Sequence, residues 1–412
     1  MRHFHSMPKL PRNFSVAILS AAAFSAASLP VTAQNATSLP TSMYGVGELS
    51  PGDGGRYAGM GNVGIALNRI GFQNTLNPAA ITRMDSTCFI FDVGASASYA
   101  RYSFLSEHST AFTGNPNRIS MGFRVLPRWY AVIGAAPYSS VGYVIQTEEE
   151  VEGIPGNYTY SLFEGTGGLY RCYLTNAFVL NRHLSVGVNL GMITGTVTQS
   201  ETQENAVVEY ESFKRAFYAD FGLHYEFSAG KRKWTAGAVF APSFKIHHDN
   251  TLTYSNSSTS ESVDKNYHSR TQYLPMHLGA GLSMNTQRWI LTADYNYLDW
   301  SRNSSSYTSM KYENQHKVNL GGSYITSPRL PRSTELMGGI GFGNSYINLK
   351  GGKMQYMEAS IGASFPIRYS YLSLGATWRK QINSQSNLMQ ESRFSLNLNL
   401  TFGERLSRMK LK

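Results

Sequence analysis

Strict alternation of apolar and polar residues is the feature that most limits what this sequence can fold into. In residues 394–402, Phe or Leu occupies every second position, with Ser, Asn or Thr between them. The same pattern recurs at 184–192, 276–284 and 372–379. Because neighbouring side chains of a strand point to opposite faces, a period of two gives each strand one apolar and one polar face. The sequence therefore predicts β-strands rather than helices.

The predicted strands are long. A tilted strand needs about 9 to 11 residues to cross a bilayer, whereas strands of soluble sandwiches usually have about 5 to 6. Length therefore favours an all-β fold, a transmembrane antiparallel β-barrel with its apolar face toward lipid, over a soluble sandwich. We expect about fourteen strands, at 87–104, 117–126, 129–147, 166–180, 184–200, 206–228, 234–255, 269–284, 288–300, 315–325, 334–346, 354–366, 369–381 and 391–403. The barrel would thus occupy residues 87–403.

Composition excludes other classes. Only 15% of the residues are charged, against about 25% in an average soluble domain. Beyond the N-terminal segment, no apolar run approaches the ~18 residues of a membrane-spanning helix. Cys88 and Cys172 are too few for a disulfide scaffold and lack the spacing of a metal or redox motif, and the sequence leaves open whether they are bonded. We expect neither a metal nor a cofactor.

The two ends of the chain carry different signals. Basic residues precede an apolar stretch at 14–31, and small residues follow at 31–33, which is typical of a secretory signal peptide. Residues 1–33 would be removed, and the exported chain would enter the outer membrane of a Gram-negative bacterium. Residues 404–412 form a short basic tail after the last predicted strand.

Connections between the strands alternate in length and charge. Short, basic connections lie at 127–128, 181–183, 230–233, 285–287, 326–333 and 367–368, and longer acidic ones include 148–165, 256–268 and 301–314. We place the short turns in the periplasm and the long loops outside the cell. The basic rim either contacts anionic lipid headgroups or consists of ordinary solvated turns.

Residues 34–86 do not fit the strand pattern. This segment is glycine-rich and irregular, and it is apolar enough to prefer the inside of a barrel. The spacing of Gly59, Gly61 and Gly64 matches a dinucleotide fingerprint only formally, because no βαβ unit surrounds it. These glycines would allow close backbone packing, and Asn77 and Pro78 would shape a turn.

Several motifs together resemble one family of proteins. The segments Arg-Tyr-Ala-Gly-Met-Gly (56–61), Val-Gly-Ile-Ala (63–66) and Asn-Pro-Ala (77–79), ahead of a long barrel, look like the FadL/TodX family of outer-membrane transporters for hydrophobic compounds. Residues 293–300 and 390–396 are also similar to members of this family. The resemblance implies a 14-stranded barrel plugged by an N-terminal hatch, here residues 34–86. Its motif would be Asn77, Pro78 and Ala79.

The resemblance also implies a transport path. In the family a kinked third strand opens the barrel wall sideways, and the matching residues here are Pro137, Tyr138, Ser139, Ser140 and Gly142. A hydrophobic ligand, of the long-chain fatty acid or aromatic hydrocarbon type, would cross an apolar pocket and leave into the outer-membrane lipid. The barrel would be monomeric. The alternative function is a non-enzymatic β-barrel component of a protein-secretion or surface assembly.

Other functions receive less support from the sequence. No Gly-x-Ser-x-Gly elbow is present, and we expect no catalytic residues and no enzyme activity. An esterase that uses His277 with a serine remains the enzymatic alternative. The chain has 36 Lys and Arg against 26 Asp and Glu, but these cations are spread over turns, so we expect no nucleic-acid partner.

Overall fold

A computed structural model describes most of the chain that follows the predicted signal peptide. It describes residues 37–50, 55–67, 69, 72–85, 87–104, 107–150, 156–230, 232–256, 261–266, 270–305, 307–329, 333–349, 352–367, 370–383 and 389–405. The predicted signal peptide (1–33) and residues 406–412 of the predicted tail lie outside the described residues. Among the described residues, no helix is suited to crossing a bilayer. Cys88 and Cys172 are both free.

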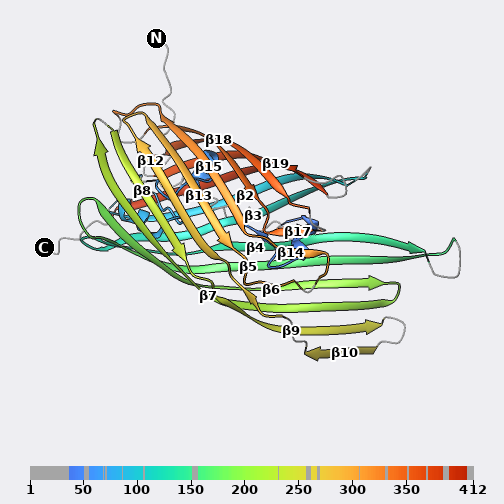
Figure 1. The fold of residues 1–412 in the computed structure, drawn as a ribbon. Helices are drawn as coiled ribbons and strands as arrows, with labels where there is room; N and C mark the ends of the chain where they lie inside the picture. The colour runs from blue at the N-terminus through green and yellow to red at the C-terminus, as the bar shows by residue number, and fades with distance from the viewer. Residues whose placement is uncertain are drawn as a thin grey trace, which may run out of the picture. The chain divides into compact units, whose positions relative to one another are not determined.

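The chain folds into a closed antiparallel β-barrel of 14 strands (Figure 1), which confirms the predicted fold class. Each strand pairs with the next, and the last pairs with the first, so the sheet closes. The strands are β2 (Cys88–Phe104), β3 (Glu107–Leu126), β4 (Trp129–Glu150), β5 (Tyr158–Val179), β6 (Leu184–Gln203), β7 (Ala206–Ala229), β8 (Arg232–Ala241) continued by β9 (Lys245–Asn256), β11 (Gln272–Tyr273) continued by β12 (Met276–Asn285), β13 (Trp289–Asp299), β15 (Gln315–Ile325), β16 (Glu335–Asn344), β18 (Gln355–Ile367), β19 (Ser370–Asn383) and β20 (Gln390–Arg405).

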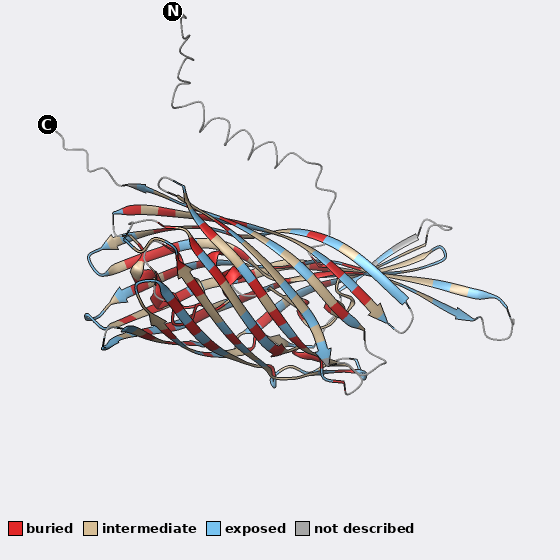
Figure 2. Cartoon of the chain, turned by 90° about the horizontal axis from the view of Figure 1, so that it is seen from above, coloured by how far each residue is buried: buried red, intermediate tan, exposed pale blue. Residues whose placement is uncertain are grey.

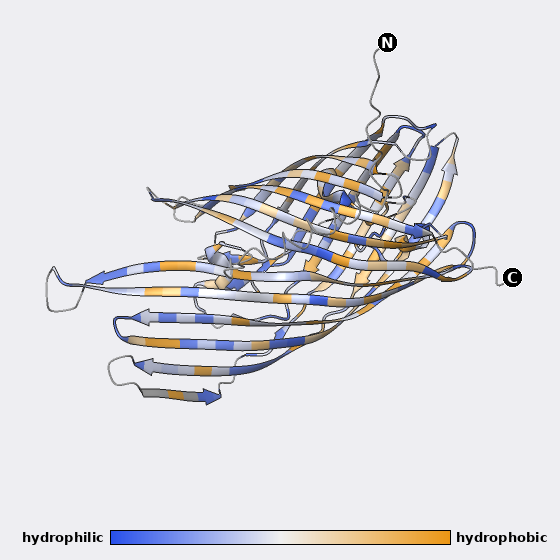
Figure 3. Cartoon of the chain, turned by 180° about the vertical axis from the view of Figure 1, so that it is seen from behind, coloured by the Kyte–Doolittle hydropathy of each residue, from blue (hydrophilic) through white to orange (hydrophobic). Residues whose placement is uncertain are grey.

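The apolar face of the barrel points outward. On β20, Phe394, Leu396, Leu398, Leu400 and Phe402 are all exposed, whereas the intervening Asn399 and Thr401 are buried. The alternation is visible as banding along the strands in Figure 2 and as a change in hydropathy in Figure 3. Rings also stack between neighbouring strands, as in Phe91 and Phe402, whose centroids lie 5.1 Å apart. Such a surface is stable against lipid and unfavourable in water.

Several predicted boundaries were wrong. Strand β3 begins at Glu107 instead of residue 117, and β4 and β5 extend to Glu150 and from Tyr158, so most of the predicted loop at 148–165 is strand. The predicted loop at 256–268 contains β10 (Glu261–Asn266), which pairs with β9. These hairpins project beyond the barrel (Figure 1). Beyond the outward apolar rows of the barrel, apolar and polar residues no longer alternate in the sequence, although the backbones of neighbouring strands continue to pair.

Prolines interrupt two neighbouring strand paths. The predicted strand at 234–255 is divided at Pro242 into β8 and β9, and the predicted strand at 269–284 is divided at Pro275 into β11 and β12. Strand β8 pairs with β12, and β9 pairs with β11. Because proline cannot donate to the ladder, both paths break at the same height of the wall. Both prolines line the cavity described below.

The N-terminal segment lies within the barrel. It contains the short 3-10 helices η1 (Pro40–Met43), η2 (Arg56–Met60) and η3 (Pro78–Arg83) and the two-residue strand β1 (Glu48–Leu49). Helix η2 contacts β15, β16, β18, β19 and β20, whereas η3 contacts β4, β5, β6 and β7. Because these contacts involve strands from opposite parts of the wall, the segment crosses the lumen.

A small two-stranded sheet covers one end of the lumen. Strand β14 (Met310–Tyr312) pairs with β17 (Ile347–Leu349) inside the predicted loop at 301–314 and the connection after β16. The rings of Trp300, Tyr312 and Tyr346 contact one another; the Trp300 centroid lies 6.0 Å from that of Tyr312 and 4.2 Å from that of Tyr346, and the two tyrosine centroids lie 6.3 Å apart. These rings form an apolar cluster with Val46 and Ile347, which we call the cover.

The outward apolar face can be tested with one charge. Leu398 lies at the centre of the outward row of β20 and is 47% exposed. We expect Leu398→Arg to lower the free energy of unfolding by about 2–4 kcal/mol in lipid vesicles, because it places a charge in hydrocarbon. Leu398→Ala is the control and should have a much smaller effect. Equal urea-unfolding curves for the two variants would contradict a lipid-facing position.

Candidate functional site

The predicted hatch motif is fixed against one side of the barrel wall. Asn77 precedes η3 and is fully buried; its Oδ1 accepts a hydrogen bond from the backbone N–H of Ala79 (3.0 Å). Its Nδ2 donates to the carbonyls of Ile65 (2.7 Å) and Leu223 of β7 (3.1 Å). The backbone N–H of the first helical residue has no acceptor within the helix, so a proline, Pro78, is tolerated at this position. Asn77 therefore joins the motif both to the rest of the plug and to the wall.

Glycines in the wall make room for this motif. A Cβ atom on Gly222 of β7 would lie 2.1 Å from Asn77 Oδ1, and one on Gly187 of β6 would lie 2.4 Å from the Pro78 carbonyl carbon. Neither distance is possible without movement of the plug. The wall therefore accommodates the motif through missing side chains, a complementarity that the sequence did not reveal.

The three plug glycines contact other parts of the wall. Gly59 packs on Gly362 of β18, where a Cβ atom on Gly59 would lie 2.7 Å from the Gly362 Cα. Gly61 has a φ of +76°, which disfavours any other residue, and its N–H donates to Ser360 Oγ (2.7 Å). The N–H of Gly64 donates to Asp294 Oδ2 (2.6 Å).

Buried charges of the wall hold the plug as well. Asp294 of β13 also accepts the N–H of Ile65 (2.8 Å), so one carboxylate fixes two plug amides. Arg56 of η2 forms an ion pair with Glu335 of β16, and both side chains are almost fully buried. The Arg56 guanidinium lies 3.6 Å from the centroid of the Phe72 ring. Breaking such a pair would leave an unpaired buried charge, which costs about 3–5 kcal/mol.

A cavity of about 280 Å³ lies between the plug and the cover. Leu49, Leu274, Leu298 and Ile347 are among its apolar lining residues. Charged and polar side chains line it too: Glu48, Arg171, Asp220, His277, Asp294, Asn296, Lys317, Glu358 and Arg379. The apolar pocket predicted from the sequence is thus present only in part. The cavity suits a molecule that has both an apolar and a polar portion.

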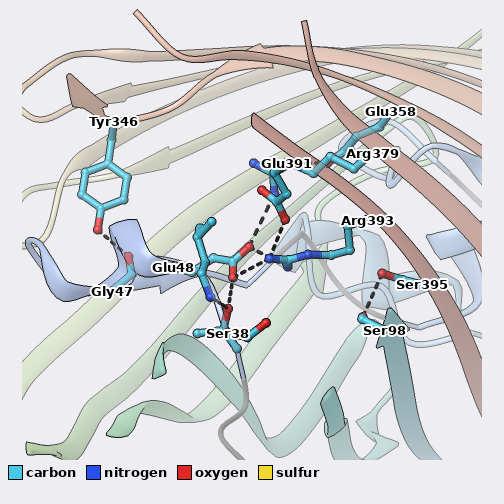
Figure 4. Close-up of polar contacts among 12 residues, drawn as sticks. Ser38, Gly47, Glu48, Ser98, Tyr346, Glu358, Arg379, Glu391, Arg393 and Ser395 are labelled. Carbon is cyan, nitrogen blue, oxygen red and sulfur yellow. Dashed lines mark hydrogen bonds and ion pairs between the residues drawn. The ribbon is translucent and has the colours of Figure 1, made fainter. Parts of the chain in front are cut away.

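Strand β1 is held by ion pairs across the lumen. Glu48 receives two hydrogen bonds from the Arg393 guanidinium of β20 (2.7 and 3.0 Å), and Arg379 of β19 lies 3.7 Å away (Figure 4). The Tyr346 hydroxyl of the cover donates to the carbonyl of Gly47. Burial alone raises the pKa of Glu48, but the two arginines outweigh burial and hold this pKa below its usual range.

The barrel wall is incomplete between β3 and β4. Their pairing runs from Leu126 and Trp129 only as far as Ile119 and Ala135, although both strands continue well beyond these residues. Beyond this point, in the part of the chain that the structure describes, β3 pairs only with β2, and β3 and β4 diverge (Figures 1 and 3). We call the divergence the seam. A second cavity, of about 110 Å³, is lined by residues from both of its sides.

Prolines at bulges explain where the seam begins. Pro116 on β3 lies beside a register shift, at which the backbone pairing with β2 passes from Arg118 to Pro116. Pro137 on β4 lies beside a shift that leaves Tyr138 without a counterpart on β5. Each proline removes a donor, and each bulge bends its strand. Pro116 was missed because the residues before it are polar and were interpreted as a loop.

The N-terminal segment occupies the free edge of β4 at the seam. Glu48 and Leu49 of β1 pair with Ser140 and Ser139. The Ser42 hydroxyl donates to the carbonyl of Gly142 (3.2 Å) and accepts from its N–H (3.1 Å). The predicted kink residues therefore lie together at the seam, where β1 replaces β3 as the partner of β4.

The sequence did not single out the residues that hold β1. Glu48, Arg379 and Arg393 are charged side chains, two of them on polar strand faces that point into the barrel. A charge that faces a closed lumen needs a partner. Arginines at inward-facing positions of the predicted strands could therefore have indicated that ion pairs lie inside the barrel. Among the described residues, the hydrogen-bond partner of His277 is Asn296 and not a serine; the His277 Nε2 lies 2.9 Å from Asn296 Oδ1.

The sheet closes into a barrel, the N-terminal segment lies in its lumen, and its apolar face points outward. These three features together define a plugged β-barrel of the outer-membrane type. A family model described as BamG matches residues 15–409. The chain belongs to this family. No curated protein sequence matches the chain.

Solved structures share the fold at low sequence identity. The "CymD monoaromatic hydrocarbon channel" superposes with a TM-score of 0.59 at 15% identity, over 86% of this chain and 98% of that chain. The toluene transporter TbuX of Ralstonia pickettii gives 0.59 at 13% identity, over 85% and 98%. A Pseudomonas aeruginosa FadL homologue gives 0.59 at 12% identity, over 86% and 99%. The predicted FadL/TodX resemblance is thus supported by the fold, whereas the matching family model has a different name.

Packing of the hatch motif on wall glycines can be tested directly. We expect Gly222→Val to displace Asn77 and to raise the conductance of the protein in planar bilayers, because the added side chain overlaps the motif. Gly338→Ala is the matched control, since its Cβ would meet no atom closer than 3.8 Å. Unchanged conductance of a folded Gly222→Val barrel would contradict this account of the plug.

Proposed function

We propose that this protein transports hydrophobic small molecules across the outer membrane and releases them sideways through the seam between β3 and β4. The observation that carries the proposal is the end of pairing at Ile119 and Ala135 beside a lumen cavity. The likeness in fold to a hydrocarbon channel and to a toluene transporter supports it. The ligand would be of the long-chain fatty acid or aromatic hydrocarbon type.

The cavity favours a ligand with one polar end. Leu49, Leu274 and Leu298 would contact its apolar body, while Arg171 or Lys317, which also line the cavity, would contact an anionic head. A purely apolar ligand would desolvate these charges without replacing their hydrogen bonds. A long-chain fatty acid therefore fits the lining better than an aromatic hydrocarbon does.

Release would require β1 to leave the edge of β4. Leu49 of β1 and Pro137 of β4 line both cavities, so β1 stands between the larger cavity and the seam. Moving β1 would break the Glu48 ion pairs and open a path from the lumen to lipid. The barrel would act as a monomer in the outer membrane of a Gram-negative bacterium, after export by the signal at residues 1–33. No catalytic step and no cofactor are part of this proposal.

The first prediction of this proposed function concerns Glu48. We expect Glu48→Gln to weaken the docking of β1 and to increase labelling of a cysteine placed at Leu49, because the charge on Glu48 is lost. Since the pKa of Glu48 is lowered, the native ion pairs should persist at neutral pH. They should break only when the pH falls below the usual glutamate range of about 4.3. Equal labelling with and without the Glu48→Gln change would count against β1 as the gate.

The second prediction concerns the seam prolines. We expect the double change Pro116→Val and Pro137→Val to let β3 and β4 pair further and to reduce uptake of a long-chain fatty acid about tenfold. The chemical reason is that both donors are restored at the bulges. Pro366→Val is the matched control, since Pro366 pairs with Tyr371 in regular register away from the seam. Normal uptake by a folded double variant would rule out release through the seam.

The second candidate function is a β-barrel component of a protein-secretion or surface assembly. The observation that favours it is the set of strands β4, β5, β6, β7, β9 and β10, which extend past the closed wall. A transporter needs no such projecting sheet. Stoichiometric co-purification with other envelope proteins, together with normal fatty-acid uptake in a deletion strain, would favour assembly over transport.

A further inference from the structure

The outer part of β4 is a strand with one open edge. From Val141 to Glu150 it pairs with β5 on one side. On the other side, among the described residues, the N-terminal segment reaches only as far as Gly142. Residues Tyr143–Glu150 therefore present an unpaired ladder of backbone groups. Such an edge is stable in water but not in lipid, which places it outside the bilayer.

The direction of these backbone groups follows from the contacts that already exist. The carbonyl of Tyr138 accepts a hydrogen bond from the N–H of Ser50 (3.0 Å), and Gly142 is bonded on both groups to Ser42. Since alternate residues of a strand point their backbone groups to the same side, Val144, Gln146, Glu148 and Glu150 also point away from β5. Their N–H and C=O groups face the open edge.

The side chains along the edge change in character. Tyr143 and Ile145 point to the inner face of the projecting sheet and belong to an apolar cluster with Val141, Val197 and Phe163. Glu148, Glu149 and Glu150 follow in succession and are exposed. None of the three forms an ion pair with a described residue. The edge therefore offers apolar contacts near the barrel and negative charge at its tip.

We propose that this edge is a docking site for an extended, basic segment of a partner protein, which adds to β4 as a further strand. Strand β1 already uses this mode of addition on Ser139 and Ser140, so the new strand would continue an existing interface. Apolar residues of the segment would extend the cluster at Tyr143 and Ile145, and Lys or Arg would face Glu148–Glu150. A second copy of the same edge is disfavoured, because its acidic tip would repel this one.

This site would serve the second proposed function, the assembly component, and it can be tested without any transport assay. The probe is a fluorescent, end-capped synthetic peptide of alternating valine and threonine that ends in two lysines. Its binding to the detergent-purified full chain is measured by fluorescence anisotropy. We expect saturable binding that weakens with salt and is lost when alternate peptide amides are N-methylated.

Edge variants test the same site from the side of the protein. Val144→Pro with Gln146→Pro removes two edge donors whose N–H groups do not face β5, and proline is tolerated on edge strands. We expect binding to weaken about tenfold or more. Val144→Ala with Gln146→Ala is the matched control; it shortens the same side chains, keeps both donors and should bind like the native chain.

Three results would overturn the docking site. They are absence of saturable binding to the native chain, equal binding of the N-methylated peptide, and equal binding by the folded proline variant. If the proline variant fails to fold, the N-methylated peptide on the native chain still decides the matter. Replacement of the peptide lysines by glutamate should abolish binding, and retained binding would refute the role of Glu148–Glu150. Since fatty-acid uptake is not measured, failure of transport and failure of docking are distinguishable.

Discussion

Pairing of every backbone group that faces lipid is the constraint on which this structure depends. Unpaired N–H and C=O groups in hydrocarbon cost several kcal/mol each, roughly, so a spanning sheet must close. The barrel meets this requirement by pairing β2 with β20. The exception lies where β3 and β4 part beside Pro116 and Pro137. There β1 and Ser42 of the same chain bind part of the open edge of β4. The interruption of strand pairing is therefore local.

The inside of the barrel is organised by a different requirement, the pairing of buried charge. Asp294, Glu335 and Glu48 each bind groups of the plug or of the wall. The plug contributes amides, a guanidinium and a carboxylate to these contacts. Buried polar groups of the wall and of the plug therefore serve as each other's hydrogen-bond and ion-pair partners. Glycines of the wall supply the matching shape, since Gly187 and Gly222 leave the space that Pro78 and Asn77 occupy.

Sequence patterns predicted the spanning part of this fold well, because lipid imposes a strict period of two. The row from Phe394 to Phe402 and its polar neighbours took the faces expected of them. Outside the bilayer the same physics no longer applies, and for that reason β3 from Glu107 and the ends of β4 and β5 were missed. Contacts inside the lumen could not be predicted either. The partner of Arg393 is Glu48, a residue 345 positions away, and only closure of the sheet brings the two together.

The clamp between Arg393 and Glu48 links the two ends of the chain in space. Arg393 belongs to β20, the strand that seals the cylinder against β2, whereas Glu48 belongs to the segment enclosed by that seal. A single guanidinium thus couples the strand that closes the barrel to the segment inside it. Any change that displaces one of these two elements therefore also acts on the other.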